Sequence, residues 1–82
     1  MNQAIHFPDR EIWDEEKQAV CFPVLVHGMQ LTCAISGETL RRRFGGSAPL
    51  EIFCENRWDL EEEVSDFIRD QMEDDQGWIW LS

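Results

Sequence analysis

The stretch that decides the fold is Gln18–Ser36, which reads QAVCFPVLVHGMQLTCAIS. In its middle, Gly28-Met29 fits a two-residue turn of type II′, in which glycine occupies the first central position. This turn places Val24 opposite Cys33 on the partner strand. In that register one face of the strand pair is entirely apolar and consists of Phe22, Val24, Val26, Leu31, Cys33 and Ile35. The stretch therefore predicts a β-hairpin that buries one face.

Pro23 lies inside the first strand of this hairpin. Proline has no backbone N–H to donate to a neighbouring strand. We therefore expect Pro23 at a bulge or at an edge position of the sheet.

Two short helices are expected after the hairpin. Ser36 is a candidate N-cap for a helix over residues 37–44, and Gly45-Gly46 ends that helix. A second helix over about 48–56 starts with proline near its first turn, where proline is favoured. Its expected apolar stripe consists of Leu50, Phe53 and Cys54.

The third helix, over about 60–73, has the clearest helical pattern in the chain. Asp59 is its expected N-cap, and Glu62 stands three residues later as the partner in a capping box. Apolar residues recur at helical spacing and comprise Leu60, Val64, Phe67, Ile68 and Met72. The opposite side of this helix is acidic.

Both ends of the chain supply strands. Ile5–Phe7 alternates apolar and polar residues, and Trp78–Leu81 is an apolar run that pairs back into the sheet. Strands followed by helices and a final strand predict an α+β fold. We expect one domain, 1–82, with a small, largely antiparallel sheet and the three helices packed on one face.

The composition restricts the partners of the protein. Seventeen acidic and seven basic residues among 82 give a formal net charge of −10. Such a charge repels nucleic acid and anionic membranes, so we expect neither as a partner. It favours solubility and attracts basic proteins. Four Trp and five Phe can support a core without metal or disulfides.

The N-terminal residues lack the basic region and apolar run of a signal peptide. No stretch approaches the roughly 20 apolar residues that a membrane-spanning helix requires. Three cysteines cannot all pair within one chain. We therefore expect a cytoplasmic protein with free thiols.

The soft metal ligands of the chain are Cys21, Cys33, Cys54, His6 and His27. None of them forms the close pairs typical of zinc sites, and the hairpin register points Cys21 and Cys33 to opposite faces. Cys33 and Cys54 are expected to be small core residues. No cofactor or metal is expected.

Nucleophilic catalysis needs a thiol or hydroxyl beside a base. Cys21 and His27 are six residues apart on one strand, about 20 Å by strand rise, which is too far for a hydrogen bond. The arginines 41–43 lie in the last turn of a helix, where the helix dipole favours cations. We assign no catalytic residue and do not expect an enzyme.

The acidic side of the third helix is the one candidate binding surface. Glu62, Asp66 and Glu73 lie farthest from the apolar stripe of this helix, and Arg69 is placed to pair with Asp66 and Glu73. An acidic face can attract a basic protein, and it can equally be a solvated surface.

The chain resembles a small proteobacterial family, the domain of unknown function 1488, and within it an enterobacterial branch. The matching segments run along nearly the whole sequence and are Ile5-His6-Phe7-Pro8-Asp9, Val20-Cys21-Phe22-Pro23, Cys33-Ala34-Ile35-Ser36 with Leu40 and Phe44, Asn56-Arg57-Trp58-Asp59, and Asp74-Asp75-Gln76-Gly77-Trp78. The resemblance implies a compact α+β domain from a bacterial cytoplasm. It implies no activity, so no residue inherits a role.

Two functional hypotheses follow. The first is a non-enzymatic interaction module that uses its acidic helix face on a basic protein. The alternative is a small-ligand binding or catalytic domain with a cleft formed in a homodimer. A deep pocket that holds His27, Arg57 or Cys21 would favour the alternative.

Overall fold

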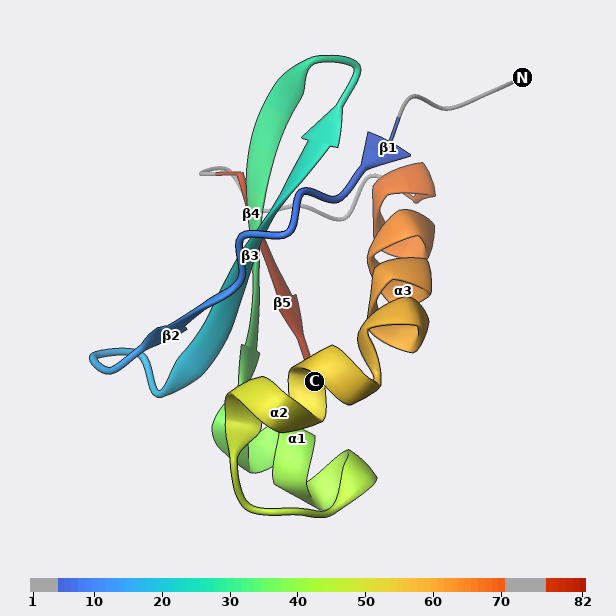
Figure 1. Cartoon of the computed structure of the whole chain (residues 1–82). Helices are drawn as coiled ribbons and strands as arrows, with labels where there is room; N and C mark the ends of the chain where they lie inside the picture. The colour runs from blue at the N-terminus through green and yellow to red at the C-terminus, as the bar shows by residue number, and fades with distance from the viewer. Residues whose placement is uncertain (1–4, 71–76) are drawn as a thin grey trace.

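The computed structural model describes residues 5–70 and 77–82. In chain order its elements are β1 (Ile5–His6), β2 (Ile12–Asp14), β3 (Ala19–Val26), β4 (Met29–Ser36), α1 (Gly37–Phe44), α2 (Pro49–Glu55), α3 (Arg57–Arg69) and β5 (Trp78–Leu81). The strands form one sheet in the order β1-β3-β4-β5, with β2 also paired to β3. In Figure 1, α3 runs beside this sheet, and α1 and α2 lie at its lower end. The predicted α+β fold is confirmed.

The sheet is mixed. β1, β2 and β4 pair antiparallel with β3, whereas β5 pairs parallel with β4. The chain leaves the end of β4 and returns through the helices, so β5 runs in the same direction as β4. The largely antiparallel sheet was predicted correctly, and so was the C-terminal strand. β2 was not predicted, because Ile12 and Trp13 are adjacent apolar residues and show no apolar-polar alternation.

The hairpin register differs from the prediction by two residues. Val24 pairs with Leu31 rather than with Cys33. His27 and Gly28 form the turn, with φ of 51° and 84°. Positive φ at both central positions is typical of a type I′ turn, and histidine tolerates this region better than most residues. A shift of two residues keeps every side chain on its predicted face, because the side-chain period of a strand is two.

Pro23 occupies the expected edge position. β1 pairs with β3 at Leu25 and Val26, and β2 pairs with it from Ala19 to Cys21. Pro23 therefore has no partner in β1 or in β2. On this edge of β3, the missing N–H of proline interrupts no strand pairing.

The main core lies between one face of the sheet and the three helices. Phe22 and Phe53 meet at its centre, with ring centroids 4.7 Å apart. The buried members of this cluster are Val20, Phe22, Val24, Cys33, Ile35, Leu40, Ile52, Phe53, Leu60, Val64, Ile79 and Leu81. Residues from all three helices are present, so the prediction that the helices pack on one face is confirmed.

The helix ends agree only in part with the prediction. Ser36 caps α1 as expected, since its Oγ accepts a hydrogen bond from the Thr39 N–H at 3.0 Å. The predicted capping box of Asp59 and Glu62 is wrong, because α3 already begins at Arg57 and Asp59 lies inside its first turn. Asn56 both ends α2 and precedes α3, so the third helix starts earlier than its apolar stripe suggests.

The apolar stripe of α2 was also partly wrong. Ile52 and Phe53 are buried, whereas Leu50 and Cys54 are exposed. The inward residues follow the helical spacing from Pro49 through Ile52 and Phe53 to Asn56, which turns Cys54 outward.

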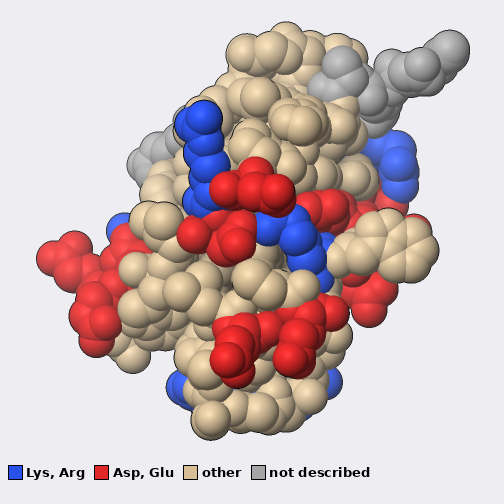
Figure 2. Space-filling view, in the orientation of Figure 1, with Lys and Arg blue, Asp and Glu red and all other residues tan. Residues whose placement is uncertain are grey.

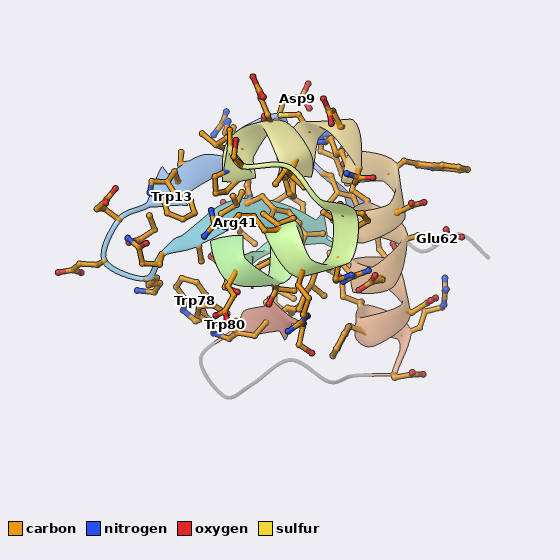
Figure 3. The ribbon with its side chains drawn as sticks, turned by 90° about the horizontal axis from the view of Figure 1, so that it is seen from below. Asp9, Trp13, Arg41, Glu62, Trp78 and Trp80 are labelled. Atoms are coloured by element: carbon orange, nitrogen blue, oxygen red, sulfur yellow. The ribbon has the colours of Figure 1, made fainter. Side chains whose placement is uncertain are left out.

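The second face of the sheet, here called the helix-free face, carries a small separate cluster. Ala19, Cys21 and Ala34 are buried there, and Trp78 packs against them. Strand pairing places on this face His6, Ile12, Asp14, Ala19, Cys21, Pro23, Leu25, Gln30, Thr32, Ala34, Ser36, Trp78 and Trp80. Trp78 and Trp80 stack with centroids 6.0 Å apart, and they lie next to each other in Figure 3.

Candidate functional site

The outer face of α3 is built by the spacing of its apolar residues. Leu60 and Val64 are buried against the sheet, and Phe67 and Ile68 pack beside them. One hundred degrees of rotation per residue then turns the intervening positions outward. The exposed residues of this outer face are Trp58, Asp59, Glu62, Asp66, Arg69 and Asp70. In Figure 3, Glu62 projects from α3 on the side of the molecule opposite Trp78 and Trp80.

The structure brings together two of the three predicted site residues. Glu62 and Asp66 are both exposed on the outer face of α3. They are four residues apart, so they lie one above the other on the same side of the helix. Glu73 lies outside the described residues.

Trp58 extends this row toward the start of the helix. It stands four residues before Glu62 and is 78% exposed, the highest value among the large hydrophobic residues that the structure describes. A shallow groove of about 290 Å³ runs beside it and is lined by Phe7, Trp58, Glu61, Glu62, Ser65 and Arg69. The groove therefore combines an exposed indole with carboxylates.

A second hollow lies farther along α3. It measures about 200 Å³ and is lined by Glu63, Asp66, Phe67 and Asp70. Its lining combines the half-buried ring of Phe67 with three carboxylates. α3 thus borders two depressions, on different sides of the helix, in which an apolar surface meets carboxylates.

Some of the carboxylates of α3 form ion pairs with arginines of this chain. Arg69 pairs with Asp66 as predicted, and both side chains are more than half exposed. Arg43 pairs with Glu63 and joins α1 to α3. Its hydrogen bond to Glu63 raises the pKa of Arg43. Among the described residues no ion pair involves Glu62, so its carboxylate can accept an outside cation.

Arg57 fixes the first turn of α3 to the segment between β1 and β2. Its guanidinium contacts Glu11 at 2.5 Å and Glu61 at 2.6 Å, and donates to the carbonyl of Pro8 at 2.9 Å. Asp9 lies 3.2 Å away. Burial opposes the charge of Arg57, but these carboxylates outweigh it, so the pKa of the guanidinium is raised. This network holds the groove beside Trp58 in shape.

Sequence reasoning missed both Trp58 and the role of Arg57. Trp58 stands four residues before Glu62, but the predicted third helix began only after it, so the helical pattern did not include Trp58. The partners of Arg57 are 46 residues away in the case of Glu11, so no local pattern could indicate them.

The remaining candidates do not form a site. Cys21 and Cys33 are buried and point to opposite faces, as predicted, and all three cysteines are free. Burial raises the pKa of Cys33 to about 12. Cys54 was expected in the core but is exposed, and its thiol lies 3.5 Å from a carboxylate oxygen of Glu11. His27 lies in the hairpin turn. No cluster of metal-ligating side chains occurs within residues 5–70 and 77–82.

The three arginines of α1 do not form a basic stripe. Arg41 donates to the carbonyl of Ser47, whereas Arg43 turns toward Glu63. Figure 2 shows acidic side chains spread over the face that carries α2 and α3, with basic side chains among them. Within the described part of the chain, no helix is long and apolar enough to cross a membrane.

Comparison with known proteins agrees with this picture. The chain is 66% identical, over 99% of both chains, to the uncharacterised protein YrdB of Escherichia coli strain K12, and it matches YrdB of Shigella flexneri equally well. A crystal structure of a protein of unknown function from Shewanella loihica PV-4 superposes with a TM-score of 0.91 at 29% identity, covering 99% of this chain and 94% of that one. The model of the family described as a protein of unknown function, DUF1488, matches residues 5–81, and the chain belongs to that family.

Proposed function

We propose that this domain is a non-enzymatic interaction module that binds a basic protein through the outer face of α3. The observation that carries the proposal is the exposure of Trp58 beside Glu62 in a groove that also contains Glu61 and the exposed Arg69. An acidic face alone is ordinary for a protein with a net charge of −10. Within it Trp58 is 78% exposed, and aromatic residues are enriched at protein interfaces relative to the rest of the surface.

The combination suits a lysine or arginine side chain. Such a side chain has an apolar stem and a charged head, so the stem can lie on the indole while the head meets a carboxylate. A cation over an indole face adds roughly 0.5–1 kcal/mol at an exposed site. Tryptophan is also enriched among the residues that contribute most to protein interfaces. Within one groove, Trp58 provides the indole for the apolar stem and Glu62 provides the carboxylate for the charged head.

The net charge supports the same class of partner. Seventeen acidic residues set up a negative potential that accelerates encounters with a basic protein and opposes binding of nucleic acid or anionic membranes. The free thiols fit a reducing compartment, and we place the protein in the cytoplasm.

The alternative, a small-ligand or catalytic cleft, is not supported. Three hollows on the described residues measure about 200–290 Å³ and are open to solvent, whereas ligand sites are usually deeper and of about 300–1,000 Å³. Arg57 is engaged in ion pairs and His27 lies in a turn. Of the three residues named for this alternative, Cys21 lines one of these three hollows.

The test uses a fluorescent peptide of alternating lysine and leucine, titrated with the protein at low salt and read by fluorescence anisotropy. Trp58→Ala and the double change Glu62→Gln with Asp66→Asn should each weaken binding several-fold. The matched control, Glu16→Gln with Glu55→Gln, removes the same charge from exposed positions outside this face and should change binding little. Equal losses in both double variants would mean that only net charge matters, and the proposed site would be abandoned.

A further inference from the structure

We propose that the groove beside Trp58 accepts one cationic side chain of the partner, at Glu62, and that Arg69 is a built-in cation that pairs with the next acceptor along the helix, Asp66. This inference rests on the proposed function and states which partner segment the site selects. That segment carries a single lysine or arginine between apolar residues, rather than a run of basic residues.

Two carboxylates line this groove, those of Glu61 and Glu62. The carboxylate of Glu61 lies 2.6 Å from the guanidinium of Arg57 and is therefore already neutralised within the chain. For the side chain of Glu62, the part of the chain that the structure describes provides no hydrogen bond and no ion pair. Asp59 and Asp70 are exposed on α3 but do not line the groove. Glu62 is thus the open acceptor within it.

The other lining residues favour an apolar neighbourhood for the partner's cation. Trp58 stands four residues before Glu62, so both side chains lie on the same side of α3. Phe7 adds a half-buried ring from the segment that follows β1. The hydroxyl of Ser65 donates to the carbonyl of Glu61 at 3.0 Å, so this side chain adds no charge. Apolar residues that flank the partner's cation can therefore contact the two aromatic side chains.

Arg69 places a positive charge at the far end of the same groove. It follows Glu62 by seven residues, which is two helical turns, about 10.5 Å along the axis and on nearly the same side. Its side chain is 53% exposed and pairs with Asp66, which is 61% exposed. A second cation of the partner would be repelled by this guanidinium and would have to displace it from Asp66. The groove therefore disfavours a run of basic residues.

Two short peptides with blocked ends, which differ in one residue, test this selection. The first has a single lysine between leucines, and the second has another lysine two positions farther on, where the first has glutamine. Residues two apart in an extended peptide lie on one side, about 6.6 Å apart, close to the rise of about 6 Å between Glu62 and Asp66. Binding at about 150 mM salt is followed by the NMR signal of the Trp58 indole N–H, assigned with Trp58→Phe.

The single-lysine peptide tests Glu62 as the acceptor. Glu62→Gln should weaken binding about threefold or more, because the lysine loses its carboxylate. The matched control Glu16→Gln removes the same charge from an exposed turn between β2 and β3 and should change binding little. The double change Asp66→Asn with Arg69→Gln removes the built-in pair without changing the net charge, so binding of this peptide should stay within about twofold of the wild type.

The two-lysine peptide tests Arg69 as the built-in cation. Arg69→Gln alone leaves Asp66 without its arginine and should improve binding of the two-lysine peptide about threefold more than binding of the single-lysine peptide. The matched control Arg42→Gln removes an exposed arginine of α1 and should not distinguish the two peptides. Circular dichroism checks that each variant is folded, and all the substituted side chains are exposed in the structure.

Equal gains for the two peptides in Arg69→Gln would overturn the role of Arg69, and equal effects of Glu62→Gln and Glu16→Gln would overturn Glu62 as the acceptor. Absence of single-lysine binding at millimolar concentration, while the alternating lysine and leucine peptide binds, would show that the site needs several cations. Each of these results leaves the proposed function standing if Trp58→Ala still weakens binding of the alternating peptide. Unchanged binding in Trp58→Ala removes the proposed function itself.

Discussion

The guanidinium of Arg57 and the carboxylate of Glu11 lie 2.5 Å apart and join residues 46 positions apart in the chain. Both side chains are about four-fifths shielded from solvent. The contact fixes the start of α3 to the segment that leads into β2. The groove beside Trp58 is formed where these two parts of the chain meet.

Replacing Arg57 with methionine should lower the free energy of unfolding by about 2 kcal/mol. The change leaves the partly buried carboxylates of Glu11 and Glu61 without their cation, which is more damaging than loss of an exposed pair. Urea unfolding followed by circular dichroism measures the effect. The control Arg69→Met removes only the exposed pair with Asp66 and should cost less than about 1 kcal/mol. Equal effects of the two changes would show that the Arg57 network does not stabilise the fold.

The same network predicts a pH dependence. The hydrogen bond from Arg57 lowers the pKa of Glu11 below its ordinary value of 4.5. As the pH falls, the unfolded chain therefore takes up this proton before the folded chain does. The stabilisation is complete above the unfolded pKa and is lost as the pH falls through the lower folded pKa.

Unfolding free energies measured between pH 7 and pH 3 should show this loss. Glu11→Gln cannot titrate, so its curve should be flatter than that of the wild type below about pH 5. Identical slopes for the two proteins would mean that Glu11 has the same pKa in both states.

The hairpin shows what the sequence could predict and what it could not. Alternation along β3 and β4 assigned each side chain to the correct face, because burial depends on the period of two. The alternation did not decide whether the turn is His27-Gly28 or Gly28-Met29, since either turn puts each side chain on the same face of the sheet. The backbone of His27 decides between them, and its positive φ has no signature in the hydrophobic pattern.

The candidate site was predictable to a similar extent. The acidic side of α3 follows from helical spacing, so Glu62 and Asp66 were placed correctly on its exposed face. Trp58 was not assigned a role, because the predicted start of the helix at Asp59 excluded it. The ion pairs of Arg57 depend on contacts between distant segments, which spacing along one helix does not encode.

Thiol titration should separate the cysteines by burial. Cys54 is exposed and should react with an aromatic disulfide reagent in the folded protein. The pKa is raised by burial at Cys21 and Cys33 and also at Cys54, so accessibility separates the thiols: Cys21 and Cys33 are buried and should react only on unfolding. We expect one fast thiol in the native state and three in denaturant. Fewer than three in denaturant, under reducing preparation, would indicate a disulfide.

Removal of the C-terminal strand, residues 78–82, should abolish cooperative folding. Ile79 and Leu81 are buried in the main core, and each contributes on the order of 1.5–3 kcal/mol. A domain of this size is stable by only about 4–12 kcal/mol. Thermal unfolding of the truncated chain should show no transition. As a milder comparison, Ile79→Ala should be more destabilising than Trp80→Ala, because Trp80 is half exposed. A truncated chain that still melts cooperatively would show that β5 is dispensable.

The outer face of α3 should be dispensable for folding. Glu62 and Asp66 are exposed like charges four residues apart, an arrangement that weakly destabilises a helix. Changing them to Gln and Asn removes that repulsion and also removes the exposed pair between Asp66 and Arg69, each effect worth a few tenths of a kcal/mol. The two effects oppose each other, so the free energy of unfolding should change by less than about 1 kcal/mol.

Urea unfolding of this double variant, compared with the Glu16→Gln, Glu55→Gln control, measures the change in stability. The contrast with Glu63 makes the prediction specific, because Glu63 pairs with the partly buried Arg43 and Glu63→Gln should cost more than the double change does. A loss of several kcal/mol in the double variant would place Glu62 or Asp66 in a structural network and remove the reason to regard them as binding residues. Unchanged stability together with weakened binding of the basic peptide is the result that a docking surface requires.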